Sequence, residues 1–273
     1  MLGDTVTNPF FAEVMAGVEE VAFEKDFGVL FSFTERKKDK ELRILEDFTR
    51  RGVEGLILLS VQEDASLESF VSSCHIPLML FQRYRPDWPC DSLCTDDRRG
   101  GSLALDHLLA LGHRRIAFLS GNTQPSNSAS LREAVYREKV SQLDPLWSEA
   151  WVADANYTFE GGYAATLRVL GLQGPRPTAF IAISDRVALG CLAALRQAGI
   201  SVPEEISVVG YDNLSWLDYG NPPLTSVDHQ AREQGRRMAE RILLRGKKND
   251  LPFEQIVLEP FLKVRGTTGP ALA

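Results

Sequence analysis

Two polar residues, Asp212 and Asn213, end the stretch PEEISVVGYDN, shortly after a run rich in β-branched residues. Residues 206–209 are bounded by Pro203 and Gly210, which predicts a short strand buried on both faces. In an open parallel α/β sheet, ligands bind beyond the carboxyl ends of the strands, so this carboxylate and amide could hydrogen-bond a polar ligand. Asp-Asn after a strand is also ordinary turn chemistry. Taken alone, the stretch leaves both interpretations open.

An aromatic residue, Phe10, stands in the first turn of another predicted element. Asn8-Pro9 is a strong helix start, with Asn as the N-cap and Pro at the first helical position. The apolar residues from 11 to 23 form one stripe at helical spacing, and Phe10 falls off that stripe. An aromatic side chain at the start of a helix that follows a strand could contact a ligand. A staple contact within the protein is the alternative.

Motifs of catalysis are missing from the sequence. It contains no GxSxG nucleophile elbow, no GxxxxGK phosphate loop, no GxGxxG and no HExxH. The four histidines are scattered without ligand spacing, and His107 and His113 fall in helix or turn positions where a structural role is expected. Cys90 and Cys94 could pair or hold a metal, but no histidine or second cysteine pair stands near them. The sequence therefore predicts neither an enzyme nor a metal or cofactor site.

Composition restricts the class of protein further. The chain has 273 residues, 44% of them hydrophobic, and a net charge of −7, which argues against a nucleic-acid-binding surface of its own. The arginines between Arg232 and Arg245 recur at helical spacing with glutamates among them, as on a solvated helix face. No apolar run is long enough to span a bilayer, and no signal peptide is evident. We expect a cytoplasmic protein with reduced cysteines and no membrane contact.

Strand and helix signals alternate along almost the whole chain, which predicts parallel α/β architecture. The predicted strands are 28–33, 53–60, 76–81, 93–95, 115–120, 151–152, 178–184 and 207–211, with an extended segment at 222–227 and one or two strands in 256–264. Helices are predicted over 9–23, 38–51, 66–74, 98–111, 128–143, 159–170, 185–198 and 232–244. Two successive units meet near Gly112. The last helix follows the second unit, so the chain is expected to cross between units more than once.

Several of these segments, in this order, resemble the ligand-binding core of LacI/GalR-type transcriptional regulators, which is related in fold to periplasmic sugar-binding proteins. The segments are TNPFFAEV at 7–14, VEGLIL at 53–58, DDRRG at 96–100 with His107-Leu108, LGHRRIAF at 111–118, RPTA at 176–179, SDRVALG at 184–190, 202–213 and PPLTSV at 222–227. Their spacing holds across nearly the whole chain, so the resemblance is far more specific than any single motif.

The resemblance implies an α/β fold of two doubly wound parallel-sheet lobes, periplasmic-binding-protein-like of type I, joined by a multi-crossover hinge. We place the N-terminal lobe at 1–112 plus 228–248 and the C-terminal lobe at 113–227 plus 249–273. The resemblance further implies a clamp that closes on a small-molecule effector, commonly a sugar or sugar derivative, by population shift. Family members are usually dimers or tetramers, so a homodimer is expected.

Two departures from the family pattern affect these expectations. The helix-turn-helix segment is not in this sequence, so operator DNA is expected to be contacted only through a segment outside it. The family's first strand precedes the TNPFF segment, where only residues 1–7 stand here. We expect either a weakened first lobe or partial replacement of that strand by residues 2–6.

The resemblance also assigns ligand-contacting residues. Arg132, in SASLR at 128–132 followed by Tyr136, falls at the family's ligand-contacting arginine, and Asp212 at its acidic contact. Tyr157 stands where the family often has an aromatic residue over the ligand, and with Phe10 it could sandwich a ring. Arginine and carboxylate side chains together suit the paired hydroxyls of a sugar.

Three further candidates carry a structural alternative. Ser184 and Asp185 follow the strongest predicted strand, where the family more often has Asn-Asp, and Asp185 could equally be the N-cap of its helix. Asp96 is a candidate from the first lobe, with helix capping as its alternative. The rival function is a periplasmic or extracellular sugar-binding protein, which shares the fold and needs no DNA partner.

Overall fold

The computed structural model describes residues 1–3, 8–34, 37–59, 65–83, 85–121, 128–143, 149–248 and 250–272. The chain divides into two compact units. Unit 1 comprises Met1–Thr95 and Gln230–Leu258, and unit 2 comprises Asp96–His229 and Glu259–Ala273. The chain therefore passes between the units three times, in agreement with the multiple crossings expected from the sequence.

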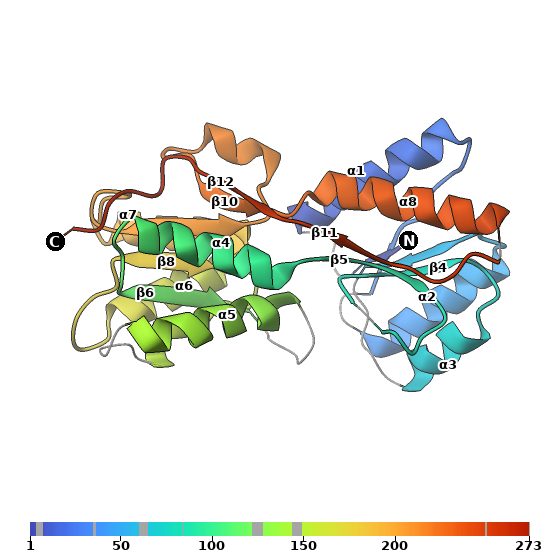
Figure 1. Ribbon diagram of the computed structural model, residues 1–273, viewed down its shortest axis with the longest axis horizontal. Coiled ribbons are helices and arrows are strands. Elements are labelled where there is room, and N and C mark those ends of the chain that lie inside the picture. The colour runs from blue at the N-terminus through green and yellow to red at the C-terminus, as the bar shows by residue number, and fades with distance from the viewer. Residues whose placement is uncertain are drawn as a thin grey trace. The chain divides into compact units, whose positions relative to one another are not determined.

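Within the described residues, unit 1 is built on a six-stranded sheet in which every pairing is parallel. In spatial order the strands are β11 (Gln255–Leu258), β5 (Asp91–Thr95), β4 (Leu78–Phe81), β3 (Leu56–Leu58), β1 (Leu2–Gly3) and β2 (Ser32–Phe33). Helices α1 (Pro9–Glu24) and α8 (Ala231–Lys247) cover one face, and α2 (Lys38–Arg50) and α3 (Ala65–Ser73) cover the other (Figure 1). Strand β1 lies between β2 and β3, so Leu2 and Gly3 supply the strand that is expected before the TNPFF segment.

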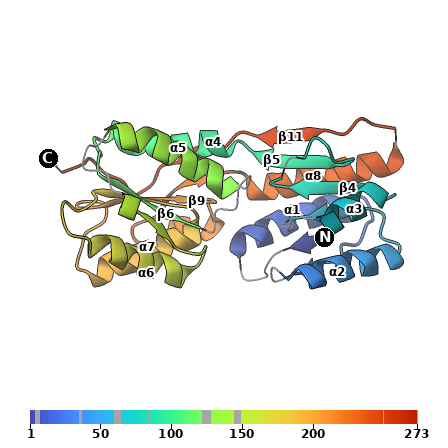
Figure 2. The same ribbon diagram turned by 90° about the horizontal axis from the view of Figure 1, so that it is seen from below.

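The second sheet repeats the same strand order. Its described strands are, across the sheet, β12 (Phe261–Lys263), β10 (Thr225–Asp228), β9 (Ser207–Tyr211), β8 (Ala179–Ala182), β6 (Ile116–Ser120) and β7 (Val152–Asp154), and only the β10–β12 pairing among them is antiparallel. Helices α4 (Asp97–Ala110) and α5 (Ser128–Leu143) lie on one face, and α6 (Phe159–Leu170) and α7 (Asp185–Gln197) on the other (Figure 2). Short 3-10 turns, η1 (Glu149–Trp151) and η2 (Ser215–Tyr219), complete the unit.

In each sheet, the second strand along the chain lies outside the first, and the third lies on the opposite side of the first. Connections on the two sides of the first strand therefore run in opposite directions, which is the topological switch point of doubly wound sheets. In unit 2 this point lies between β6 and β8. The expected doubly wound architecture is confirmed in both units.

The unit boundaries differ from those drawn on the sequence at two places. Helix α4 belongs to unit 2, because it packs beside α5 on the second sheet (Figure 2). Strand β11 belongs to unit 1, because it pairs in parallel with β5 from Gln255 beside Ser92 to Leu258 beside Thr95. A strand with alternating exposure at a sheet edge carries little sequence signal of which sheet it joins.

A close crossing of α1 and α8 is made possible by glycine on each helix. A Cβ atom at Gly17 would lie 1.9 Å from the carbonyl oxygen of Arg232, and one at Gly235 would lie 2.0 Å from the carbonyl oxygen of Val14. Helix α1 begins as the sequence predicts, with the Asn8 side chain accepting a hydrogen bond from the Phe10 amide at 3.2 Å. The prediction of the α1 start is therefore confirmed.

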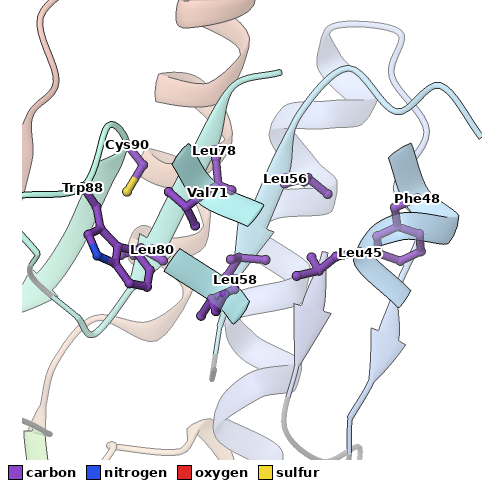
Figure 3. Close-up of a cluster of buried hydrophobic side chains, with 10 residues drawn as sticks. Leu45, Phe48, Leu56, Leu58, Val71, Leu78, Leu80, Trp88 and Cys90 are labelled. Atoms are coloured by element: carbon purple, nitrogen blue, oxygen red, sulfur yellow. The ribbon is translucent and has the colours of Figure 1, made fainter. Parts of the chain in front are cut away.

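The α2–α3 side of the first sheet buries an apolar cluster. Figure 3 shows leucine side chains of β3 and β4 meeting those of α2 and α3, with Trp88 and Cys90 from the loop before β5 at one end. The buried members of the cluster are Leu45, Phe48, Leu56, Leu58, Leu67, Val71, Leu78, Leu80, Trp88 and Cys90. The four cysteines all lie among the described residues, and none of them forms a disulfide. Within the part of the chain that the structure describes, no helix combines the length and apolar character needed to cross a membrane.

The arginine-rich face of α8 is not solvated along its whole length, so that prediction is wrong at its C-terminal end. The Asp91 side chain is fully buried at the start of β5, where it accepts hydrogen bonds from Arg245 at 3.0 Å and from Arg241 at 3.0 Å. Burial alone would raise the pKa of Asp91, but these hydrogen bonds outweigh it and hold the pKa below its ordinary value. Helical spacing cannot reveal a carboxylate contributed from a distant strand.

Candidate functional site

Arg132 is the centre of a buried polar cluster in unit 2. It projects from α5, the helix that follows β6, and is only 7% exposed. Its Nη1 donates to the carbonyl oxygen of Ile183 at 2.9 Å, directly beyond the carboxyl end of β8. Arg132 therefore bridges the carboxyl ends of β6 and β8, the two strands that flank the switch point, where ligands bind in sheets of this kind.

Asp97 fixes the orientation of the Arg132 guanidinium. Arg132 Nε donates to Asp97 Oδ1 at 2.7 Å, and the side chains are 9% and 3% exposed. Burial alone would lower the pKa of Arg132, but the Asp97 carboxylate outweighs it and raises the pKa above its ordinary value. Asp97 was not among the site residues predicted from the sequence. A signal for Asp97 was present in the sequence, because it adjoins Asp96, the residue that was predicted as a ligand contact.

Tyr211 connects Arg132 with Asp212. The guanidinium lies over the Tyr211 ring, 3.5 Å from its centroid, and the Tyr211 hydroxyl donates to Asp97 Oδ1 at 3.1 Å. Burial raises the pKa of Tyr211 well above its ordinary value, so the phenol stays protonated. Gly100 makes this packing possible, because a Cβ atom there would lie 2.3 Å from the Tyr211 hydroxyl oxygen. Gly100, the glycine of the DDRRG segment, therefore leaves room for Tyr211 in the site.

Asp212 follows β9 as predicted and is 8% exposed. Its Oδ1 lies 3.3 Å from Nε2 of His229, a residue that is itself 3% exposed and packs edge-on against the Tyr211 ring at 5.1 Å. His229 was not chosen from the sequence because a lone histidine after a strand carries no spacing signal. Arg132 and His229, the neighbour of Asp212, therefore contact the same aromatic ring, that of Tyr211.

The other residues predicted for unit 2 have different surroundings. Ser184 is the N-cap of α7, with its Oγ accepting from the Val187 amide at 3.4 Å, so the alternative that Asp185 caps this helix is wrong. Asp96 is the N-cap of α4 and accepts from the Arg99 amide at 2.9 Å, so its capping alternative is confirmed. Asp96 also falls in unit 2, whereas we expected it in the first lobe.

Tyr157 lies in the turn between β7 and α6, with a φ angle of 54°. Its ring packs against Gly121, the residue after β6, since a Cβ atom there would lie 2.2 Å from the ring. Tyr157 also contributes to the raised pKa of Arg132, which places it in the same neighbourhood. Tyr157 is therefore brought toward the Arg132 cluster.

Phe10 belongs to unit 1. It is 7% exposed, and its ring stacks against Phe81, the last residue of β4, with centroids 6.0 Å apart. It therefore lies at the carboxyl end of a strand of the first sheet. Among the described residues of both units, no group of three or more histidine, cysteine or acidic side chains is placed to hold a metal ion.

The fold and this cluster define a class of protein, the periplasmic-binding-protein-like proteins. Residues 105–268 match the family described as a periplasmic binding protein-like domain. The ribose operon repressor of Haemophilus influenzae is 30% identical over 97% of this chain and 79% of its own length. The regulator DegA of Bacillus subtilis is 29% identical over 99% of this chain and 80% of its own.

Solved structures agree with these relatives. A LacI family regulator of Enterococcus faecium with bound ribose matches with a TM-score of 0.86 and 27% identity, over 99% of both chains. The complex of the regulator CelR with cellobiose matches with a TM-score of 0.85 and 28% identity, over 97% of this chain and 83% of that one. The chain belongs to the LacI/GalR family of transcriptional regulators and carries the effector-binding core of that family.

Proposed function

We propose that the chain binds a sugar or sugar derivative through Arg132 and Asp212, as the effector-binding and dimerisation core of a DNA-binding regulator, and that it does not transform this ligand. The observation that carries the proposal is the buried Arg132 guanidinium, which Asp97 and the Ile183 carbonyl orient at the switch point of the second sheet. The relatives crystallised with ribose and cellobiose support the choice of a sugar.

Arg132 and Asp212 supply the two complementary groups that a vicinal diol needs. The guanidinium donates hydrogen bonds, and the carboxylate accepts them, so adjacent hydroxyls can each find a partner. Tyr157 adds aromatic surface for the C–H face of a ring. Each charge-assisted hydrogen bond is expected to contribute about 1.5–3 kcal/mol to binding.

Regulation then follows from differential affinity. An effector shifts a conformational equilibrium only by the ratio of its affinities for the two states, and we propose that this shift reaches operator DNA through a segment outside this sequence. Sedimentation equilibrium is expected to show a dimer. A monomer at 100 times the concentration used for binding would contradict the dimerisation part of the proposal.

The binding proposal is tested by a thermal-shift screen with sugars, phosphosugars and nucleobases, followed by calorimetry. A ligand at 100 times its Kd stabilises the folded state by about 2.7 kcal/mol, which a melting curve detects. Asp212→Asn should weaken the best sugar about 10- to 150-fold, because a neutral amide replaces the charged acceptor. Asn tolerates positive φ, so the backbone of the turn is retained.

Asp106→Asn is the matched control, since Asp106 is an exposed residue of α4 paired with Lys139 at the surface. It should leave the affinity unchanged. A panel in which no sugar raises the melting temperature, or equal affinity of wild type and Asp212→Asn, would refute the proposal.

The rival function, a periplasmic or extracellular sugar-binding protein, draws support from the description of the matching family. The two functions differ in their DNA dependence. The full-length protein of a regulator should bind DNA from its own upstream region and change that affinity when the sugar is added. A transport protein should bind the sugar and leave the DNA unbound.

A further inference from the structure

The turn that carries Asp212 has an unusual backbone. Asp212 and Asn213 are consecutive non-glycine residues with positive φ angles, 128° and 54°. Residues other than glycine rarely adopt this region, and such a conformation persists only when its surroundings over-determine it. The turn therefore needs contacts that hold it, and these contacts fix the direction of the Asp212 side chain.

Three successive backbone amides of the turn are held by three different partners. The Asp212 amide donates to the Val227 carbonyl oxygen at 2.9 Å, which extends the pairing of β9 with β10. The Asn213 amide donates to Ser226 Oγ at 3.1 Å. The Leu214 amide donates to Asp185 Oδ2 at 3.0 Å. The last two contacts come from side chains, so the backbone alone does not define the turn.

Asp185 links those two side-chain contacts. Its Oδ1 accepts from Ser226 Oγ at 2.6 Å while its Oδ2 accepts from the Leu214 amide. The residue is fully buried at the first position of α7, and a Cβ atom at Gly210 would lie 2.3 Å from Oδ1. Both carboxylate oxygens thus face β9, β10 and the turn.

We propose that Asp185 is a positioning residue that acts on the effector through Asp212 and does not contact the effector itself. This inference rests on the proposed function, in which Asp212 binds the effector. It replaces the expectation that Asp185 is a ligand contact, because a carboxylate that turned to a ligand would release the Leu214 amide and the Ser226 hydroxyl. The glycine at position 210 of the VVGYD stretch then provides the space for this carboxylate beside β9.

The first test needs no ligand. In Asp185→Ala, the amides of Asn213 and Leu214 should exchange with solvent at least ten-fold faster than in wild type, and Asp185→Asn should restore part of the protection because it keeps one carbonyl oxygen. Thr166→Val is the matched control, since Thr166 is a fully buried residue of α6 that donates to the Gly162 carbonyl at 2.8 Å. This control should leave the turn amides unchanged. Should Asp185→Ala fail to fold, Ser226→Ala removes the neighbouring contact and should expose the Asn213 amide.

The second test is a double-mutant cycle with D-ribose, titrated by calorimetry. Asp185→Asn should weaken ribose binding at least ten-fold in the wild-type background and by less than two-fold in the Asp212→Asn background, because its effect passes through Asp212. A general loss of stability, or a direct contact of Asp185 with the ligand, would give equal effects in both backgrounds. That result would overturn the proposal.

The two tests separate failure of this inference from failure of the proposed function. Absence of ribose binding by wild type would count against ribose as the effector, while amide exchange still decides the role of Asp185. Unchanged protection of Asn213 and Leu214 in both Asp185 variants would overturn the positioning role whether or not ribose binds.

Discussion

Replacement of Arg132 by methionine should destabilise unit 2 far more than loss of one hydrogen bond. The substitution removes the partner of Asp97, whose carboxylate is 3% exposed and only 2.7 Å from Arg132 Nε. Breaking a buried ion pair by removing one member costs about 3–5 kcal/mol, because the other charge stays buried without compensation. Since folded domains are stable by about 5–15 kcal/mol, we expect Arg132→Met to fold with a reduced margin.

The double variant Asp97→Asn/Arg132→Met separates this effect from packing. It removes both charges, and an asparagine at position 97 can still accept the Tyr211 hydroxyl that now donates to Asp97 Oδ1. Replacing a buried pair by neutral groups is often close to neutral, so the double variant should cost about 1–2 kcal/mol. The assay is urea unfolding followed by circular dichroism, with the free energy extrapolated to water.

Two results would show that the buried Arg132–Asp97 pair does not stabilise unit 2 as described. A cost below about 1 kcal/mol for Arg132→Met would mean that the charge of Asp97 is not compensated by this arginine. A double variant no more stable than the single one would assign the loss to packing against the Tyr211 ring instead of to the unpaired charge. Either result would remove the electrostatic argument for the orientation of Arg132.

Three other predictions concern stability. Arg245→Leu should destabilise unit 1 by about 1.5–3 kcal/mol, because the buried Asp91 loses one charged partner and keeps the other, Arg241. The same substitution at the exposed Arg237 should change the unfolding free energy by less than about 0.5 kcal/mol, and equal effects of the two variants would refute the buried pair. Gly100→Ala should lower the free energy of unfolding by about 1–3 kcal/mol, because the added methyl group overpacks against Tyr211. Gly246→Ala, at a position in α8 with open space around it, should raise the free energy of unfolding by about 0.5–1 kcal/mol. A Gly100→Ala variant as stable as wild type would show that the Tyr211 ring can move. Burial lowers the pKa of His113, so as the pH falls this histidine is protonated in the unfolded chain before it is protonated in the folded one. The free energy of unfolding should therefore fall as the pH drops below about 6.5, by up to about 1.4 kcal/mol per pH unit. His113→Gln should flatten that dependence and the exposed His75→Gln should not, as pH-dependent urea unfolding would show.

Most elements could be predicted from the sequence because their signals depend on local periodicity, whereas the doubly wound architecture was implied by the family resemblance. The β-branched run of β9, the Asn8-Pro9 start of α1 and the helix of residues 159–170 each carry their signal within a few residues. The placement of β11 in the first sheet could not be predicted, because its pairing with β5 joins residues far apart in the chain.

Among the site residues too, those with a local sequence pattern could be predicted and those defined by contacts between distant segments could not. Asp212 at the end of β9 follows from the strand pattern, whereas Arg132 could be chosen only through the family resemblance, since an arginine near the start of a helix carries no local signal. Asp97 and His229 were missed because their contacts with Arg132 and Asp212 join separate elements. The carboxylate of Asp185 was assigned to the ligand or to a helix cap, although its partners Ser226 and Leu214 lie on β10 and in the turn after β9.

The proposed function depends on direct binding of a polar small molecule by Asp212 and Arg132. A crystal structure of the chain grown with the sugar that gives the largest thermal shift tests it most directly. We predict electron density for the sugar with hydroxyl oxygens about 2.6–3.2 Å from the Asp212 carboxylate and the Arg132 guanidinium. A sugar bound away from both side chains, with Asp212 and Arg132 making only the contacts described above, would contradict the account.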